Sequence, residues 1–137
     1  MTRYGMTLLT IGLVLIIGQA RADDKEDKEK LQGEWSLVSY ELNGKSGKIP
    51  DAKYKFEGNN FYATSLSGGD GEGTFAIDSS KKPKRIDFTG KGQLVKAIYE
   101  LDGDTLKVCI GANFNERPTE FKSAEKVLVM TFKRVKK

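Results

Sequence analysis

Residues 93–110 read QLVKAIYELDGDTLKVCI, two alternating apolar and polar runs separated by the pair Asp102-Gly103. Alternate side chains of a strand point to opposite faces, so each run has one apolar face. Asp-Gly between two such runs favours a tight hairpin, because both turn positions tolerate positive φ. The segment therefore predicts two antiparallel strands that share one face, formed by Val95, Ala97, Tyr99, Leu101, Leu106, Val108 and Ile110.

The same pattern of short apolar segments, punctuated by Gly, Asn and Asp, runs from Gly33 to the end of the chain. No window holds three helical turns of amphipathic spacing, which excludes a helical bundle and a βαβ fold. Gly58-Asn59 is predicted to form a second tight link, and Asn43-Gly44 to begin a turn whose loop runs on to Pro50. Eight strands are expected, at residues 34–42, 53–57, 60–66, 73–78, 85–89, 93–101, 104–110 and 126–133.

A meander of consecutive hairpins commonly closes into a barrel, since closure removes the exposed edges that template aggregation. The predicted fold class is therefore all-β, an eight-stranded antiparallel up-and-down β-barrel. A barrel of this size is just wide enough to be filled by its own side chains or to hold one small ligand. The expected interior also includes Tyr54, Phe56, Phe75, Ile77, Ile86, Phe88, Leu128, Met130 and Phe132.

The N-terminus has the layout of a secretory signal peptide: Arg3, an apolar run over 6–18, and the small-residue pattern Ala20-Arg21-Ala22. The apolar run is shorter than the roughly 20 residues of a membrane-spanning helix, so the mature chain is not expected to span a membrane. We expect cleavage after Ala22 and export to the periplasm or the medium. The predicted organisation is a cleaved signal helix at 1–22, a charged spacer at 23–30 and a barrel domain at 31–137.

Composition excludes several classes of function. Loss of Arg3 and Arg21 with the signal peptide leaves 21 basic and 19 acidic side chains, a nearly neutral protein for which no nucleic-acid partner is expected. The chain contains no histidine, so Ser-His-Asp and Cys-His catalysis and imidazole metal sites are excluded. We expect no enzymatic activity, no catalytic residue, no metal and no cofactor. The lone Cys109 cannot form an internal disulfide, and a monomer is expected.

Two resemblances support the barrel. Gly33-Glu34-Trp35 resembles the Gly-x-Trp of lipocalins, and Arg134 stands where lipocalins place an arginine over that tryptophan. The chain from about Leu31 to Val135 also resembles a small secreted lipocalin-like domain of unassigned function that is abundant in planctomycete bacteria. The matching stretches are LQGEW (31–35), KPKRID (82–87), IYELDGDTLKVC (98–109) and RPTEF (117–121). The resemblance implies a lipocalin-like barrel closed by Trp35 and Arg134, and leaves the activity open.

Several segments have both a structural and a functional interpretation. The charged segment 23–30 suits a frayed helix or a disordered spacer with little chemistry. The glycine-rich, acidic segment 67–73 forms a flexible loop at the barrel mouth or a plain long hairpin. Arg117 acts as an anion clamp near the opening or pairs with a backbone carbonyl or Glu120. Cys109 is expected to point away from the interior, as an inert thiol under a loop or as a partner in an interchain disulfide.

Two functions remain open. The first is binding of a small apolar ligand inside the barrel, with Tyr99 or Arg117 orienting a polar end. Its candidate binding residues are Tyr54, Phe56, Phe75, Phe88, Tyr99, Val108, Arg117 and Met130. The alternative is an interaction module with a filled barrel that binds a cell-envelope protein or polymer, through its loops or a basic surface such as that at 81–85. An open cavity at the barrel mouth would distinguish them.

Overall fold

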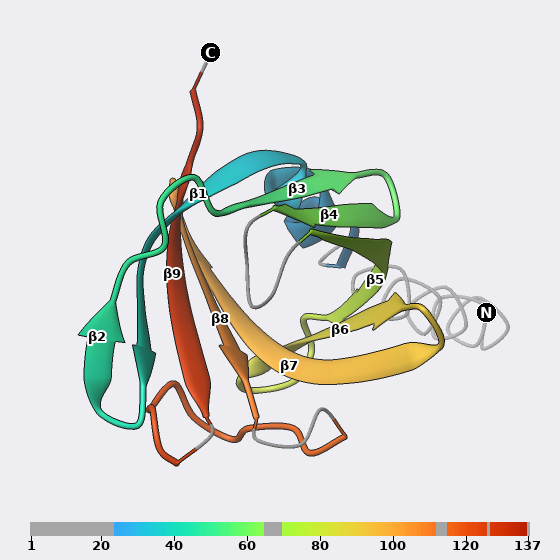
Figure 1. Ribbon diagram of the computed structural model, residues 1–137. Coiled ribbons are helices and arrows are strands. Elements are labelled where there is room, and N and C mark those ends of the chain that lie inside the picture. The colour runs from blue at the N-terminus through green and yellow to red at the C-terminus, as the bar shows by residue number, and fades with distance from the viewer. Residues whose placement is uncertain (1–23, 65–69, 112–114, 126, 137) are drawn as a thin grey trace, which may run out of the picture.

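The computed structural model describes residues 24–64, 70–111, 115–125 and 127–136 (Figure 1). The predicted signal segment at 1–22 lies outside these residues. One helix, at 24–31, precedes the strands. The strands are β1 (Gly33–Leu42), β2 (Lys45–Gly47), β3 (Lys53–Glu57), β4 (Asn60–Thr64), β5 (Gly71–Asp78), β6 (Lys84–Gly90), β7 (Gln93–Asp102), β8 (Thr105–Ile110) and β9 (Leu128–Arg134).

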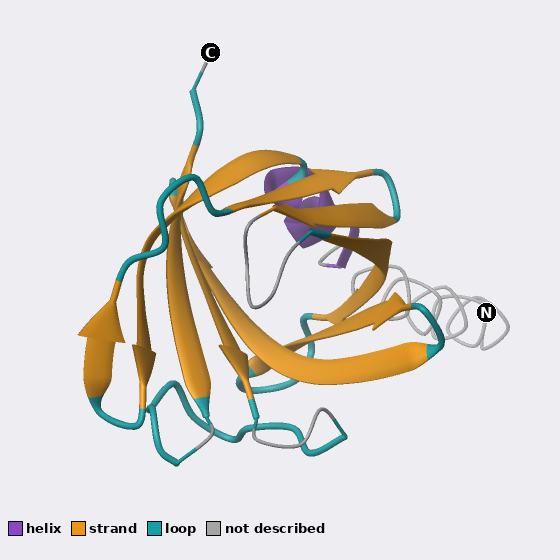
Figure 2. Cartoon of the chain, in the orientation of Figure 1, coloured by secondary structure: helices purple, strands orange, loops and turns teal. Residues whose placement is uncertain are grey.

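The sheet closes on itself, and the predicted eight-stranded antiparallel barrel is confirmed. Neighbouring strands pair in the order β1-β3-β4-β5-β6-β7-β8-β9, and β9 pairs back onto β1. The closing pair runs from Trp35 opposite Arg134 to Leu42 opposite Leu128, with a register shift between Leu37 and Ser39. Figure 2 shows the helix at one end of the strands and the long β8–β9 connection at the other. The lipocalin-like architecture expected from the resemblance fits this barrel.

A ninth strand, β2, was missed from the sequence. The expected turn at Asn43-Gly44 is present, with φ of 57° and 77°, the double positive φ of a type I′ hairpin. The chain then continues as a strand rather than as loop, and Gly47 pairs with Tyr40. The ring of Tyr40 fills the place where a Cβ of residue 47 would stand. A three-residue strand with a central serine and a terminal glycine gives no alternating apolar signal, which explains why the sequence did not reveal it.

The β7–β8 hairpin differs from the prediction by one residue. Asp102 pairs with Thr105, so the two turn residues are Gly103 and Asp104. Of these, Gly103 has positive φ, 59°, and Asp104 does not. Glycine at the first central position is the arrangement of a type II′ turn, whose twist also matches that of the flanking strands. The side chain of Asp104 is thereby available to pair with Lys136, 2.9 Å away.

Residues 24–31 form a helix packed on the barrel, so the expected frayed helix or disordered spacer is wrong. Leu31 is fully buried, and Asp27 is also buried, on the side of the helix that faces the barrel. Asp27 Oδ2 accepts hydrogen bonds from Tyr99 Oη at 2.7 Å and from Lys84 Nζ at 2.8 Å. Burial alone would raise the pKa of Asp27, but these two donors outweigh it and hold the pKa below its ordinary value. Asp24 accepts a hydrogen bond from the backbone N–H of Ser79 at 2.8 Å.

The helix closes one end of the barrel together with the plug expected from Trp35 and Arg134. The Arg134 guanidinium lies 4.3 Å from the centre of the Trp35 ring, which is a cation-π contact. Trp35 Nε1 donates to the carbonyl of Leu31 at 2.8 Å, and Arg134 donates to the carbonyl of Gln32 at 3.1 Å. The first and last parts of the domain are therefore tied to each other at the closed end.

The interior of the closed half is filled by large side chains. Phe56 and Phe75 meet edge to face at 4.9 Å, and Tyr54 stacks on Phe132 at 4.5 Å. Buried around them are Leu31, Trp35, Ile86, Tyr99, Leu106 and Val108. This packed half anchors the strands whose other ends form the open mouth.

Candidate functional site

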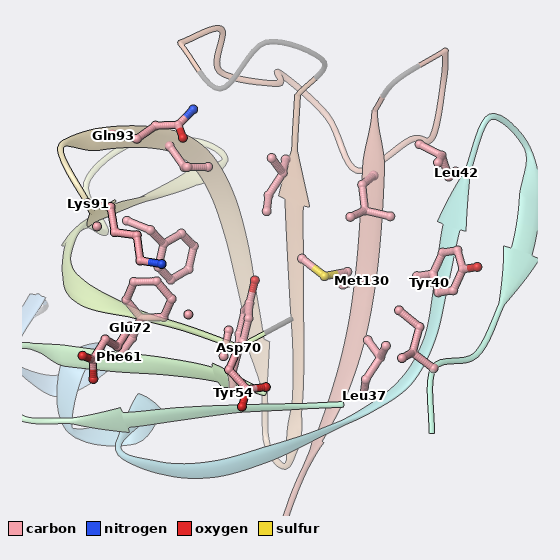
Figure 3. A pocket seen from close by; sticks show the side chains of 18 residues that line it. Leu37, Tyr40, Leu42, Tyr54, Phe61, Asp70, Glu72, Lys91, Gln93 and Met130 are labelled. Atoms are coloured by element: carbon pink, nitrogen blue, oxygen red, sulfur yellow. The ribbon is translucent and has the colours of Figure 1, made fainter. Parts of the chain in front are cut away.

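The open half of the barrel contains a cavity of about 620 Å³ (Figure 3). In an up-and-down barrel alternate connections lie at the same end, and this end carries the β1–β2, β4–β5, β6–β7 and β8–β9 connections. The lining residues come from the mouth-side ends of the strands. They are Leu37, Tyr40, Leu42, Ile49, Tyr54, Phe61, Ala63, Asp70, Gly71, Glu72, Phe88, Gly90, Lys91, Gln93, Val95, Ile110, Leu128 and Met130.

Small residues in the wall of the open half leave room for the cavity. Ala63, Gly71 and Gly90 line the cavity, whereas the interior of the closed half is occupied by aromatic rings. Gly73 and Gly90 also let β5 and β6 approach closely: a Cβ on Gly73 would lie 2.0 Å from the carbonyl oxygen of Thr89. Small residues therefore have two effects here: they leave space in the cavity, and they allow β5 and β6 to pack closely.

The floor and walls of the cavity are apolar and aromatic. Phe61 and Phe88 pack with ring centres 4.7 Å apart, and Tyr54 lies 5.7 Å from Phe88. Met130 adds a polarisable, flexible contact beside them. Tyr54 is only 5% exposed, and its burial raises the pKa of the phenol well above the ordinary value. The hydroxyl is therefore protonated at any physiological pH and acts as a hydrogen-bond donor.

The rim carries the polar groups: Asp70, Glu72, Lys91 and Gln93. Lys91 and Gly92 are the two turn residues between β6 and β7. Figure 3 shows the ammonium group of Lys91 turned toward the cavity, and the carboxylate of Glu72 turned away from it. An apolar pocket with a few polar groups at its entrance is the usual form of a small-molecule site.

Three of the predicted ligand-binding residues, Tyr54, Phe88 and Met130, line the cavity. Phe56, Phe75 and Val108 face the interior as predicted, but they are packed in the closed half and do not line it. Sequence alternation identified the inward face correctly; it did not indicate how far along the barrel each residue lies.

Tyr99 and Arg117 were expected to orient a polar end of the ligand, and the structure places both elsewhere. The Tyr99 hydroxyl is buried at the closed end, where it donates to Asp27. Arg117 lies on the outer face of the barrel, where Nη1 donates to the carbonyl of Ala97 at 2.8 Å and lies 2.7 Å from Asp87 Oδ1. Arg117 therefore has the structural role of pairing with a backbone carbonyl, with Asp87 rather than Glu120 as its acidic partner.

The lining residues that the sequence did not single out lie at or near the connections of the mouth: Tyr40, Leu42, Ile49, Lys91 and Gln93. The order of the hairpins could have identified these residues. Once the hairpin order is predicted, residues next to every second connection must share one end of the barrel. Of the segment 67–73, the residues 67–69 lie outside the described part of the chain. Asp70, Gly71 and Glu72 lie at the mouth, and Gly71 already belongs to β5.

Cys109 points away from the barrel interior and is buried under the β8–β9 connection, as expected. Its side chain is fully covered, and Sγ lies 3.6 Å from the carbonyl oxygen of Glu120. Ile98, on the same outer face, is also buried. Burial raises the pKa of the Cys109 thiol to about 11. A covered thiol with so little thiolate does not favour an interchain disulfide.

We therefore expect the Cys109 thiol of the folded protein to react with Ellman's reagent at pH 8 at least about 100-fold more slowly than that of the unfolded chain, because the thiolate fraction is that much smaller. The measurement is absorbance at 412 nm in buffer and in guanidinium chloride. Equal rates in the two solvents would show that the thiol is open to solvent.

Within the described ranges, no cluster of three or more acidic or cysteine side chains is arranged to hold a metal ion. The one helix in this part of the chain is too short and too polar to cross a membrane.

The comparisons with known proteins return no relative for this chain: no family model, no curated protein and no solved structure matches it.

Proposed function

We propose that this protein binds a small, mostly apolar molecule in the cavity at the open end of its barrel. The observation that carries the proposal is the cavity itself, which at about 620 Å³ lies within the range of small-molecule sites, roughly 300–1,000 Å³. Its floor of Tyr54, Phe61 and Phe88 offers apolar surface to bury, at about 25 cal/mol per Å².

The cavity favours this function over an interaction module, because that alternative required a barrel filled by its own side chains. Only the closed half of the described barrel is filled in this way, and the open half is not. The proposed role is non-enzymatic, which accords with a sequence that contains no histidine.

We further propose that the protein is exported and acts in the periplasm or outside the cell. Support comes from the sequence of residues 1–22 alone, and the resemblance to secreted planctomycete domains agrees with it. Expression of the full sequence in a bacterial host should yield a periplasmic product whose intact mass begins at Asp23. A product that keeps residue 1 and stays in the cytosol would contradict export without affecting the cavity.

Binding is tested with N-phenyl-1-naphthylamine, a neutral probe whose fluorescence rises in apolar surroundings. We expect saturable one-to-one binding to the wild-type protein. Ala63→Phe adds a ring to the cavity wall and should weaken binding at least about tenfold, since it removes space that the probe needs. Ala76→Phe is the matched control, because Ala76 is exposed on the neighbouring strand.

The expected result is a loss of affinity in Ala63→Phe and wild-type affinity in Ala76→Phe. Absence of probe binding to the wild-type protein, or equal affinity in both variants, would overturn the proposed site. Native mass spectrometry of protein purified from its own cells then measures the mass of any molecule that it retains.

A further inference from the structure

The turn that carries Lys91 has an unusual residue in a demanding conformation. Lys91 and Gly92 have φ of 52° and 76°, nearly the same as the 57° and 77° of Asn43 and Gly44 in the β1–β2 turn. Both are therefore two-residue turns with positive φ at each position, for which Asn-Gly is the favoured pair. Lysine adopts this left-handed conformation less readily than asparagine. The chain uses the favoured residue at one turn and a cation at the other.

Lys91 has no partner of its own in the described part of the chain: no hydrogen bond or ion pair involves its ammonium group. Figure 3 shows that the Lys91 side chain is turned toward the apolar cavity, although the residue itself is exposed. A cation in this position attracts an anion to the mouth.

Tyr54 is a second donor without a partner. Its side chain is 95% buried, and no hydrogen bond to its hydroxyl is formed by the residues that the structure describes. Tyr99, the other deeply buried tyrosine of the barrel interior, does have an acceptor, Asp27. The hydroxyl oxygen itself is not fully covered, so part of its surface is open to the cavity. Because Tyr54 lines the cavity, a molecule held there can accept a hydrogen bond from its hydroxyl.

We propose that the molecule held in the cavity is an amphipathic organic anion, a carboxylate with an apolar body. This rests on the proposed function. The carboxylate oxygens of this molecule accept hydrogen bonds from the Lys91 ammonium group at the mouth and from the Tyr54 hydroxyl in the floor. Its apolar body packs on Phe61, Phe88 and Met130. Both unpartnered polar groups are donors, which selects an acceptor-rich head over an amine. Of the two acidic residues at the rim, Glu72 turns its carboxylate away from the cavity, and Asp70 already takes part in an interaction of its own.

The test compares two molecules with the same ten-carbon body, decanoate and decanol, by isothermal titration calorimetry at low ionic strength. We expect the wild-type protein to bind decanoate five- to tenfold more tightly, and the preference to shrink in 0.5 M NaCl because salt screens the charge at the mouth. Equal affinity for both molecules would overturn the anion preference while leaving the proposed cavity function standing. Binding of neither would remove the proposed function itself.

The decisive variant is Lys91→Asn, which removes the charge but restores the favoured Asn-Gly turn. We expect it to bind decanoate no better than decanol, while its Tm is equal to or higher than that of the wild type. Loss of preference without loss of stability separates ligand recognition from a role in folding. Lys25→Gln is the control, since it removes the same charge from the exposed face of the helix at the closed end. If Lys91→Asn keeps the wild-type preference, the assignment of Lys91 is wrong.

Tyr54→Phe tests the second donor. It should weaken decanoate binding several-fold and leave N-phenyl-1-naphthylamine unaffected, because that probe has no acceptor oxygen. An equal effect on both molecules would mean that Tyr54 contributes only shape, and would overturn its assignment as a donor to the ligand.

Discussion

Replacing Gly73 with alanine is expected to destabilise the barrel by about 2–4 kcal/mol, in the range of severe overpacking. The added Cβ would lie 2.0 Å from the carbonyl oxygen of Thr89 and 2.9 Å from its carbonyl carbon. Both are backbone atoms of β6, so no side chain can rotate away to make room. The two strands would have to separate where they frame the cavity. Urea denaturation followed by tryptophan fluorescence measures the change.

Gly71→Ala is the matched control, two residues earlier in the same strand. Nothing lies within 4 Å of a Cβ at Gly71, and its φ is not positive. We expect the free energy of unfolding to change by no more than about 0.5 kcal/mol. If the two variants lose equal stability, the close approach of β5 and β6 is not what requires glycine at position 73.

Replacing Asp27 with alanine is expected to cost about 2 kcal/mol and to loosen the helix at 24–31. The substitution leaves the buried hydroxyl of Tyr99 without its acceptor, a loss of about 1–3 kcal/mol. Lys84 adds little, since its side chain is 41% exposed and water can replace the lost carboxylate. Hydrogen exchange should show faster exchange of the helix amides. Glu26→Ala is the control, because Glu26 is exposed on the same helix and pairs with Lys30, which is also exposed.

The interaction with Tyr99 can be isolated with Tyr99→Phe. If the hydrogen bond accounts for the effect, Asp27→Ala should cost much less in the Tyr99→Phe background than in the wild type. Equal costs in both backgrounds would assign the effect to helix packing instead.

The same contact predicts a pH dependence. The pKa of Asp27 is lower in the folded protein than its usual 3.8, so its contribution is present above about pH 4 and is lost as the pH falls through the folded pKa. The stability gap between the wild type and Asp27→Asn should therefore be constant near neutrality and narrow below pH 4. A gap that stays constant down to pH 2 would show that ionisation of Asp27 is not involved.

The strands and their inward faces were predictable from the sequence because burial on one face enforces a period of two. Val95, Ala97 and Tyr99 share the inner side of β7 as the alternation required. The helix at 24–31 was not predictable as a packed element. Its burial depends on Asp27 meeting Lys84 and Tyr99, residues 57 and 72 positions away. A charged residue that is buried through distant partners looks the same in sequence as one in solvent.

The candidate site was only partly predictable for a related reason. Tyr54, Phe88 and Met130 were identified as lining residues because they face inward, but Phe75 and Val108 face inward as well and are packed shut. Depth along the barrel decides which residues meet open space, and depth depends on the register of all eight strands. Lys91 was missed because a turn residue belongs to neither face.

The closed end of the barrel also determines which way the open mouth faces when the protein is attached to a support. The helix at 24–31 and the end of β9 both lie at the closed end, where Arg134 donates a hydrogen bond to the carbonyl of Gln32 (Figure 1). A linker, label or solid support attached next to Asp24 or Lys136 therefore lies at the closed end and leaves the open mouth clear. Sensors built on this scaffold need no circular permutation to keep the entrance clear.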